Sequence, residues 1–130
     1  MIPFVKQLHH IAIICSNYEA SKYFYTQLLG MEIIREVYRE ERNSYKLDLS
    51  LNGNYTIELF SFPDPPGRIS HPEAAGLRHL AFEVTNIDTT IAYFEEQKIP
   101  IEPVRIDEFT SKKFTFIADP DGLPIEFYES

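Results

Sequence analysis

The sequence predicts an α+β fold built from two tandem βαβββ modules. The first indication is an internal repeat: residues 10–13 (HIAI) are matched by residues 79–82 (HLAF), and residues 57–60 (IELF) by residues 125–128 (IEFY). The second is that each half contains the same expected order of one strand, one helix and three strands. Self-similarity of this kind indicates two copies of one supersecondary unit.

The first module is expected over about residues 7–62. Residues 7–15 form a β-branched apolar run that favours a buried strand. Ser16 and Glu19 then resemble a capping box, and Gly30 ends the helix that follows. The apolar stripe of this helix consists of Ala20, Tyr23, Phe24 and Leu28. Further strands are expected at residues 31–39, 44–51 and 55–62, with a hairpin at Asn52-Gly53-Asn54.

The second module, at about residues 78–129, repeats this order. A strand over residues 78–84 precedes a helix that Thr85 and Asp88 open and that closes before Pro100. Strands are expected near residues 101–106, 113–118 and 123–129, with a turn at Asp119-Pro120-Asp121-Gly122. The proline-rich linker, residues 63–77, joins the modules within one domain spanning residues 7–130.

Composition supports a globular chain and argues against nucleic acid as a partner. The 130 residues are 44% hydrophobic and include ten phenylalanines and eight tyrosines, which can fill a core. The net charge of −8 would repel a phosphate backbone. No apolar run is long enough for a bilayer, and nothing resembles a signal peptide. Together with the single cysteine, Cys15, this predicts a cytoplasmic location.

Strand alternation places the repeated polar residues on one face of each module. His10 shares a face with Ala12 and Ile14, and His79 shares one with Ala81 and Glu83. Glu58 and Glu126 likewise point away from their apolar neighbours. A carboxylate on such a row is costly unless it is paired, protonated or bound to a cation. Two His and two Glu are ligand types of a divalent metal site, so the repeat predicts one.

On these motifs the chain resembles the vicinal oxygen chelate superfamily, and within it the bacterial glyoxalase I-like proteins. The resemblance extends from about Leu8 to Tyr128 and includes residues 77–82 (LRHLAF) and 119–127 (DPDGLPIEF). It implies the glyoxalase/bleomycin resistance/dioxygenase fold, with a curved mixed sheet. It also implies that one divalent ion (Ni²⁺, Zn²⁺, Co²⁺ or Mn²⁺) per site is coordinated by His10, Glu58, His79 and Glu126. Such members usually form homodimers in which each site takes a His and a Glu from each of two chains.

The resemblance implies a metal-dependent lyase or isomerase that acts on a small oxygenated substrate through a metal-stabilised enediolate. Either Glu126 or Glu58 is then the catalytic base, and we favour Glu126. Glutathione-dependent enzymes carry an Arg and an Asn where this chain has Ile14 and Phe62, so the substrate is not expected to be linked to glutathione. Candidate anchors for an anionic substrate are Arg35, Arg39, Arg68, Arg78, Lys112 and Lys113.

Two alternatives remain open. One is a different metal chemistry on the same fold, with an epimerase a closer competitor than a thiol transferase or an extradiol dioxygenase. The other is a non-catalytic protein that binds a drug or another small molecule. Outside the four repeated residues, His9 should alternate to the opposite face and serve a structural or surface role. His71 is expected to be solvated, and Cys15 to be a small core residue.

Overall fold

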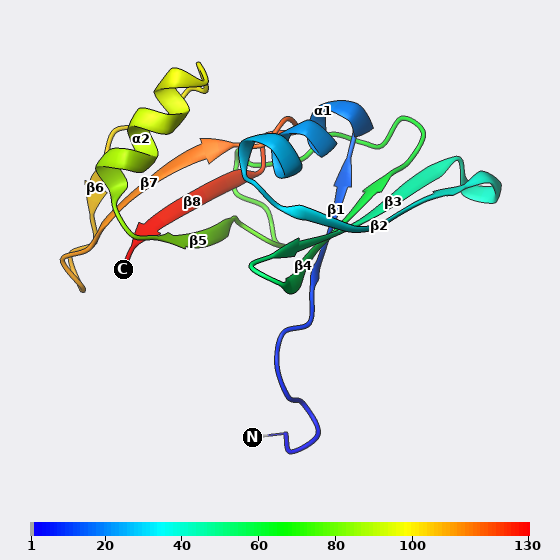
Figure 1. Cartoon of the computed structure of the whole chain (residues 1–130), viewed down its shortest axis with the longest axis horizontal. Coiled ribbons are helices and arrows are strands. Elements are labelled where there is room, and N and C mark those ends of the chain that lie inside the picture. Colours follow the sequence, from blue (N-terminus) through cyan, green and yellow to red (C-terminus); the bar gives the residue numbers. More distant parts are fainter. Residues whose placement is uncertain (1) are drawn as a thin grey trace. The chain divides into compact units, whose positions relative to one another are not determined.

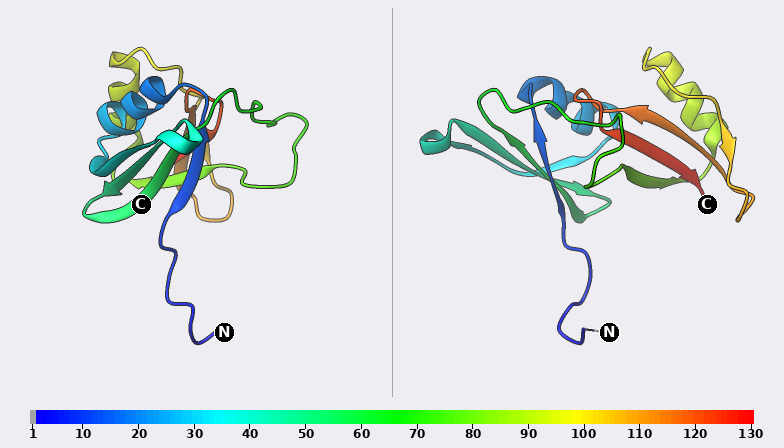
Figure 2. Two further views of the ribbon diagram at one scale, coloured as in Figure 1. Left: turned by 90° about the vertical axis from the view of Figure 1, so that its right-hand side faces the viewer. Right: turned by 180° about the vertical axis from the view of Figure 1, so that it is seen from behind.

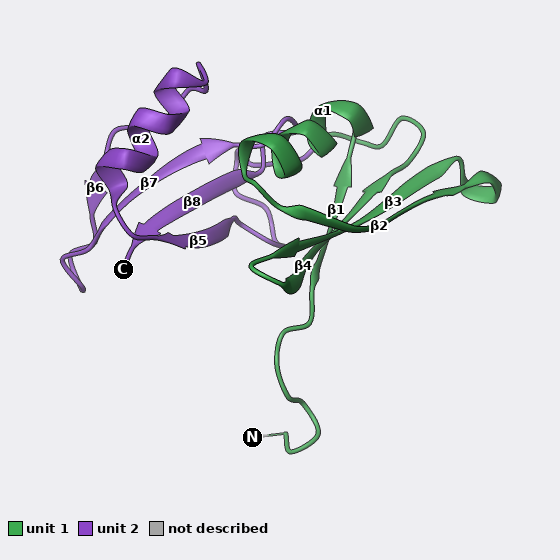
Figure 3. Ribbon diagram, viewed as in Figure 1, with its two compact units in different colours: residues 1–67 green, residues 68–130 purple. Residues whose placement is uncertain are grey.

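The computed structural model describes residues 2–130, which divide into two compact units between Gly67 and Arg68 (Figure 3). This boundary lies within the predicted linker, residues 63–77. Each unit contains one four-stranded mixed sheet and a helical segment, which confirms the predicted α+β fold with two βαβββ modules.

The first unit has the sheet order β1-β4-β3-β2 (Figure 1). Strand β1 runs parallel to β4, whereas β3 is antiparallel to both β4 and β2. Asn52 and Gly53 both have positive φ angles, 51° and 82°, in the hairpin between β3 and β4, which confirms the predicted turn. The elements are β1 (Ile11–Cys15), α1 (Tyr18–Tyr23), η1 (Phe24–Leu28), β2 (Glu32–Arg39), η2 (Glu40–Arg42), β3 (Ser44–Leu51) and β4 (Asn54–Ser61).

The second unit repeats this topology with the order β5-β8-β7-β6. Strand β5 runs parallel to β8, and β7 pairs antiparallel with β8 and β6. Figure 2 shows α2 along one face of this sheet. The predicted turn is confirmed, because Asp119 Oδ1 accepts hydrogen bonds from the backbone N–H groups of Asp121 and Leu123. The elements are β5 (Leu80–Val84), α2 (Ile87–Glu96), β6 (Arg105–Ile106), β7 (Lys113–Ala118) and β8 (Pro124–Glu129).

Alternation along the strands separates a buried row from an accessible row in each unit. In β4 Ile57 and Leu59 are fully buried, while Glu58 between them is partly accessible. In β8 Ile125 and Phe127 are buried on either side of Glu126. The core of each unit therefore takes one face of its sheet, and the predicted ligands lie on the other face.

Three local predictions were wrong. The helix caps lie one residue later than expected, because Asn17 and Asn86, rather than Ser16 and Thr85, accept from the backbone N–H groups three residues ahead. Tyr23 is 55% exposed instead of belonging to the apolar stripe. Its helix changes to a π-helix at Phe24, and the wider turn alters which residues share a face.

Candidate metal centre

In the first unit, His10 and Glu58 form a close pair. Ala12 in β1 is paired with Glu58 in β4, and His10 lies two residues earlier on the same face. The His10 Nε2 atom is 3.5 Å from Glu58 Oε1, with the two side chains 33% and 16% exposed. Parallel pairing of β1 with β4 thus brings together two residues that are far apart in the sequence.

The second unit builds the equivalent pair from His79 and Glu126. Ala81 in β5 is the partner of Glu126 in β8, so the register matches that of the first unit. The His79 Nε2 atom lies 3.3 Å from Glu126 Oε1. The repeat in the sequence is therefore a repeat of side-chain geometry as well.

The donor atoms of each pair fit a divalent metal ion. Two ligands at right angles, each about 2.1 Å from a shared ion, lie about 3 Å apart, close to both observed separations. Imidazole and carboxylate suit Zn²⁺, Mn²⁺, Co²⁺ and Ni²⁺. Within residues 2–130, however, no group of three or more His, Cys, Asp or Glu side chains could hold an ion. The structure thus forms the two pairs separately, and their joint coordination of one ion stays a prediction.

His10 is held by two further aromatic side chains. Its ring stacks on Tyr55, with the ring centroids 4.9 Å apart and the planes at 6°. Its Nδ1 atom lies 2.8 Å from Nδ1 of His9, within hydrogen-bond distance. A metal at Nε2 would require the proton on Nδ1, and His9 would then accept it. His9 does not point away from His10 as expected, because its ring also contacts Tyr55, but it is exposed, as a surface role predicts.

A charged network lies beside Glu58. Lys46 Nζ is 3.3 Å from Glu58 Oε2 and also donates to both oxygens of the buried Asp48, at 2.7 and 2.8 Å. The Tyr55 hydroxyl donates to Asp48 as well, at 2.8 Å. Burial alone raises the pKa of Asp48, but the hydrogen bonds from Lys46 and Tyr55 outweigh it and the pKa lies below its usual value. Asp48 is therefore a fixed negative charge.

Aromatic rings replace this network in the second unit. Asp48 is the cross-strand partner of Glu58, and the corresponding partner of Glu126 is Phe116. The ring of Phe116 contacts His79 edge to face, with centroids 5.3 Å apart. Glu126 also lines a hollow of about 350 Å³ together with Phe114 and Tyr128. The His79–Glu126 pair thus has aromatic neighbours where the first unit has the Lys46–Asp48 network.

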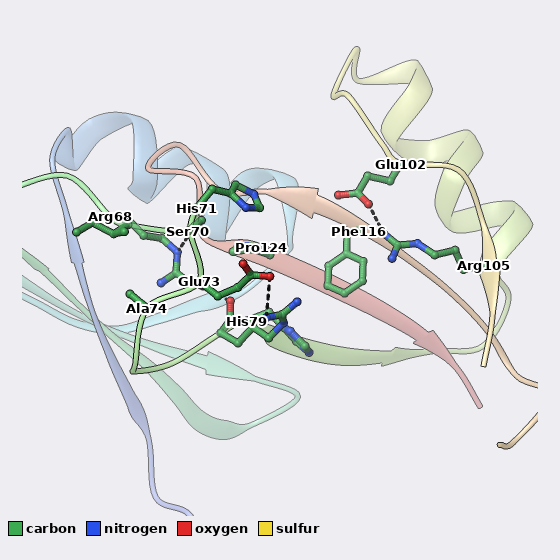
Figure 4. A pocket seen from close by; sticks show the side chains of 12 residues that line it. Arg68, Ser70, His71, Glu73, Ala74, His79, Glu102, Arg105, Phe116 and Pro124 are labelled. Carbon is green, nitrogen blue, oxygen red and sulfur yellow. Dashed lines mark hydrogen bonds and ion pairs between the residues drawn. The ribbon is translucent and has the colours of Figure 1, made fainter. Parts of the chain in front are cut away.

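His79 also faces a second cavity of about 300 Å³, which lies entirely within the second unit (Figure 4). One wall comes from the segment between Arg68 and Ala74, which overlaps the predicted linker. His71 lines this cavity and thus lies near a predicted ligand. Of the candidate anchors, Arg68 and Arg78 line it, and Lys112 and Lys113 are not among its lining residues.

Sequence reasoning missed Lys46, Asp48 and Tyr55 as neighbours of the predicted ligands His10 and Glu58. A signal for the first two was present, because alternation in the strand over residues 44–51 puts Lys46 and Asp48 on one face. Their proximity to Glu58 depends on the β3–β4 register, which the hairpin sets. Of the remaining candidate anchors, Arg35 lies 3.5 Å from Asp48, and Arg39 stacks on Phe60.

Comparison with known proteins gives consistent matches over most of the chain. A sequence model described as the Glyoxalase/Bleomycin resistance protein/Dioxygenase superfamily matches residues 7–127. The uncharacterized protein YwkD of Bacillus subtilis (strain 168) is 62% identical, over 96% of this chain and 98% of its own. The crystal structure of a glyoxalase family protein from Enterococcus faecalis superposes with a TM-score of 0.90 at 52% identity, covering 97% of this chain and 99% of that one.

A more distant match is to an enzyme of named activity. The mitochondrial methylmalonyl-CoA epimerase of Bos taurus is 30% identical over 99 residues, which are 73% of this chain and 56% of that protein.

Proposed function

Because the chain belongs to the glyoxalase/bleomycin resistance protein/dioxygenase superfamily, we propose that it is a metal-dependent lyase or isomerase acting on a small oxygenated substrate through an enediolate. The observation that carries the proposal is the repeated His–Glu pair, with Nε2–Oε1 distances of 3.5 and 3.3 Å. His10, Glu58, His79 and Glu126 would hold one divalent ion. When bound, such an ion supplies positive charge that stabilises an oxyanion as it develops on the substrate.

The surroundings of the two glutamates favour Glu126 as the catalytic base. Lys46 Nζ lies 3.3 Å from Glu58 Oε2, and this ion pair holds the Glu58 carboxylate in place. Among residues 2–130, no lysine or arginine forms an ion pair with Glu126, and its neighbours include Phe114 and Tyr128. A carboxylate without a competing cation can take a proton from carbon and return it to a neighbouring carbon. Glu58 would act mainly as a ligand.

The accessible face of the first unit supports a substrate other than a glutathione adduct. Ile14 is 55% exposed on the face that carries His10, and Phe62 lies at the end of the row that carries Glu58. Neither side chain can hydrogen-bond to a peptide carboxylate. A smaller substrate, recognised mainly through its oxygens, fits this chemistry better.

A homodimer with shared sites would complete the coordination, since each unit supplies two protein donors. Co-expression of two inactive variants, His10→Ala and His79→Ala, tests this arrangement. If each site combines one module from each chain, every mixed dimer regains one intact site, and about a quarter of the wild-type activity returns. Mixing His10→Ala with Glu58→Ala is the matched control, because both lesions lie in the first module and no site is restored. Equal activity in the two mixtures would exclude sharing.

Elemental analysis tests the metal directly. Protein purified without added metal should carry about one divalent ion per chain, and chelation should lower its thermal stability. A protein that contains no ion and is not stabilised by Ni²⁺, Zn²⁺, Co²⁺ or Mn²⁺ would contradict the proposal. A screen of the loaded protein against hemithioacetals of 2-oxoaldehydes with several thiols then examines the reaction.

Epimerisation is the second candidate, favoured by the similarity to the bovine methylmalonyl-CoA epimerase. Inverting a carbon centre requires one group that removes a proton and another that delivers one from the opposite side. Two glutamates in repeated positions, Glu58 and Glu126, can supply such a pair. Including 2-methyl-branched acyl thioesters in the same screen, in deuterated water, separates the two reactions, since an epimerase exchanges the proton without forming a new functional group.

A further inference from the structure

The cavity beside His79 is rich in cations although the chain is acidic. Its lining includes Arg68, Arg78 and Arg105, against two carboxylates, Glu73 and Glu102. The chain as a whole has a formal net charge of −8, so most of its surface repels an anion. Three guanidinium groups therefore gather next to a predicted ligand, and two of them, Arg78 and Arg105, also have a carboxylate partner.

Arg68 serves the loop itself. Its Nη2 atom donates to the carbonyl oxygens of Leu77 and Arg78, both at 2.9 Å, and its Nε donates to Ser70 Oγ at 2.9 Å. These bonds tie the two ends of the segment 68–78 together and give the cavity a defined wall. The guanidinium of Arg68 is consequently occupied by the protein.

Arg105 and Arg78 have donors to spare. Arg105 lies over the rings of Phe114 and Phe116, at 5.7 and 5.3 Å, and pairs with Glu102. Arg78 Nη1 is 3.8 Å from Glu73 Oε2, a loose contact between two exposed side chains. Each guanidinium carries five N–H donors, and one carboxylate partner satisfies at most two of them in a forked contact.

The ring of Phe116 links Arg105 to the metal ligand. His79 contacts this ring with a centroid distance of 5.3 Å, and the Arg105 guanidinium lies 5.3 Å from the same centroid. The His79 ring and the Arg105 guanidinium are therefore separated by at most the sum of these two distances. A small molecule can reach from His79 to Arg105 across the face of the cavity, as the labelled side chains in Figure 4 indicate.

We propose that this cavity binds an oxyanion group of the substrate, a carboxylate or a phosphate, through Arg105 and Arg78, while the reacting end lies at His79 and Glu126. The planar fork of arginine matches two oxygens of either group. Only the placement of the reacting end at His79 and Glu126 rests on the proposed function, since the anion subsite requires no metal. It gives the substrate class as a small oxygenated molecule with a negatively charged end.

Titration calorimetry on metal-free protein tests the subsite. Succinate and inorganic phosphate are the probes for the two kinds of group, and succinamide is the uncharged control. We expect wild-type protein to bind at least one of the two anions and not succinamide, and Arg105→Gln and Arg78→Gln each to weaken binding about tenfold, the effect of losing one charge-assisted hydrogen bond. The anion that binds more tightly identifies the group.

Two further variants make the result specific. Arg42→Gln is the matched control, since Arg42 also stacks on a phenylalanine, Phe62 at 5.4 Å, but lies in the other unit. It should leave anion binding unchanged. Arg105→Lys keeps the charge and the apolar stem but loses the fork, so it should bind more weakly than wild type and more tightly than Arg105→Gln.

The proposal is overturned if neither anion binds, or if Arg42→Gln weakens binding as much as Arg105→Gln, which would show only an effect of net charge. Thermal unfolding of each variant establishes that it is folded. Anion binding that persists in a protein with no metal affinity would leave the subsite standing and reject the proposed metal chemistry. Metal binding without anion binding would do the reverse.

Discussion

The two modules present the same pair of donors in different surroundings. Around His10 and Glu58 the first module places hydrogen-bonding and charged groups: His9, Tyr55, Lys46 and Asp48. Around His79 and Glu126 the second module places Phe114, Phe116 and two hollows. One fold, repeated twice, thus gives the same pair of side chains two different environments. Hydrogen bonds and ion pairs surround the His10–Glu58 pair, whereas hollows lie beside His79 and Glu126.

The largest expected effect concerns the two glutamates. Glu126→Gln should lower kcat by about 10²–10⁴-fold, because general-base catalysis contributes on that order. Glu58→Gln should weaken metal binding and spare more of the activity when excess metal is supplied. Steady-state kinetics at saturating metal compares the two variants. If Glu58→Gln were the more damaging at saturation, the roles of the two modules would be exchanged.

The next effect concerns the stability of the charged network. Asp48→Asn should lower the free energy of unfolding by about 2 kcal/mol at neutral pH. This is less than the cost of breaking a fully buried ion pair, because Lys46 is partly exposed to solvent and retains its ion pair with Glu58. The pKa of Asp48 is lowered in the folded state, so its contribution is present above the unfolded pKa of about 3.9 and is lost as the pH falls through the lower native pKa.

Urea unfolding of both proteins between pH 7 and pH 3 measures this difference. The gap between wild type and Asp48→Asn should narrow toward the acid end. A matched change in the second module, Phe116→Leu, alters packing without altering charge, so its effect should show little dependence on pH. A constant gap for Asp48→Asn would mean that the carboxylate does not act through its charge.

A smaller effect is expected for His9. Replacing it by phenylalanine keeps a ring beside Tyr55 but removes the acceptor for His10 Nδ1. Metal affinity should fall about tenfold, at the low end of the range for such outer partners, because His9 is exposed. Chelator competition measures the affinity, and ¹⁵N NMR of the imidazoles shows whether His10 loses its single tautomer. Unchanged tautomer and affinity would leave His9 a surface residue.

The smallest effect should be equal in the two modules. Asn17→Ala and Asn86→Ala each remove one side-chain cap, whose acceptor distances are 3.1 and 3.0 Å. Each should cost about 1 kcal/mol of unfolding free energy. Thermal unfolding checks both. A much larger loss for Asn17→Ala would indicate that the six-residue helix α1 depends on its cap more than α2 does.

The elements of the fold could be predicted from local patterns. Alternation placed Ile57 and Leu59 in the core and Glu58 on the opposite face, and the structure confirms this. The turns at Asn52-Gly53 and Asp119–Gly122 were also predictable, since their residues suit positive φ angles or side-chain caps. The predicted caps were one residue too early, because both residues of Ser16-Asn17 and of Thr85-Asn86 have side chains that can cap a helix. Only the path of the backbone selects between them.

The sequence alone predicted the four candidate donors and the face of each strand that carries them, because both predictions follow from the period of a β-strand and from the repeat. Only the tertiary structure decided what surrounds those donors. The hydrogen bond from Tyr55 to Asp48, the contact of Lys46 with Glu58 and the cavity shared by His79 and Arg105 join segments from different strands and a loop. Their distances depend on strand register and on the path of the loop, which are set by the packing of the whole unit rather than by neighbouring residues.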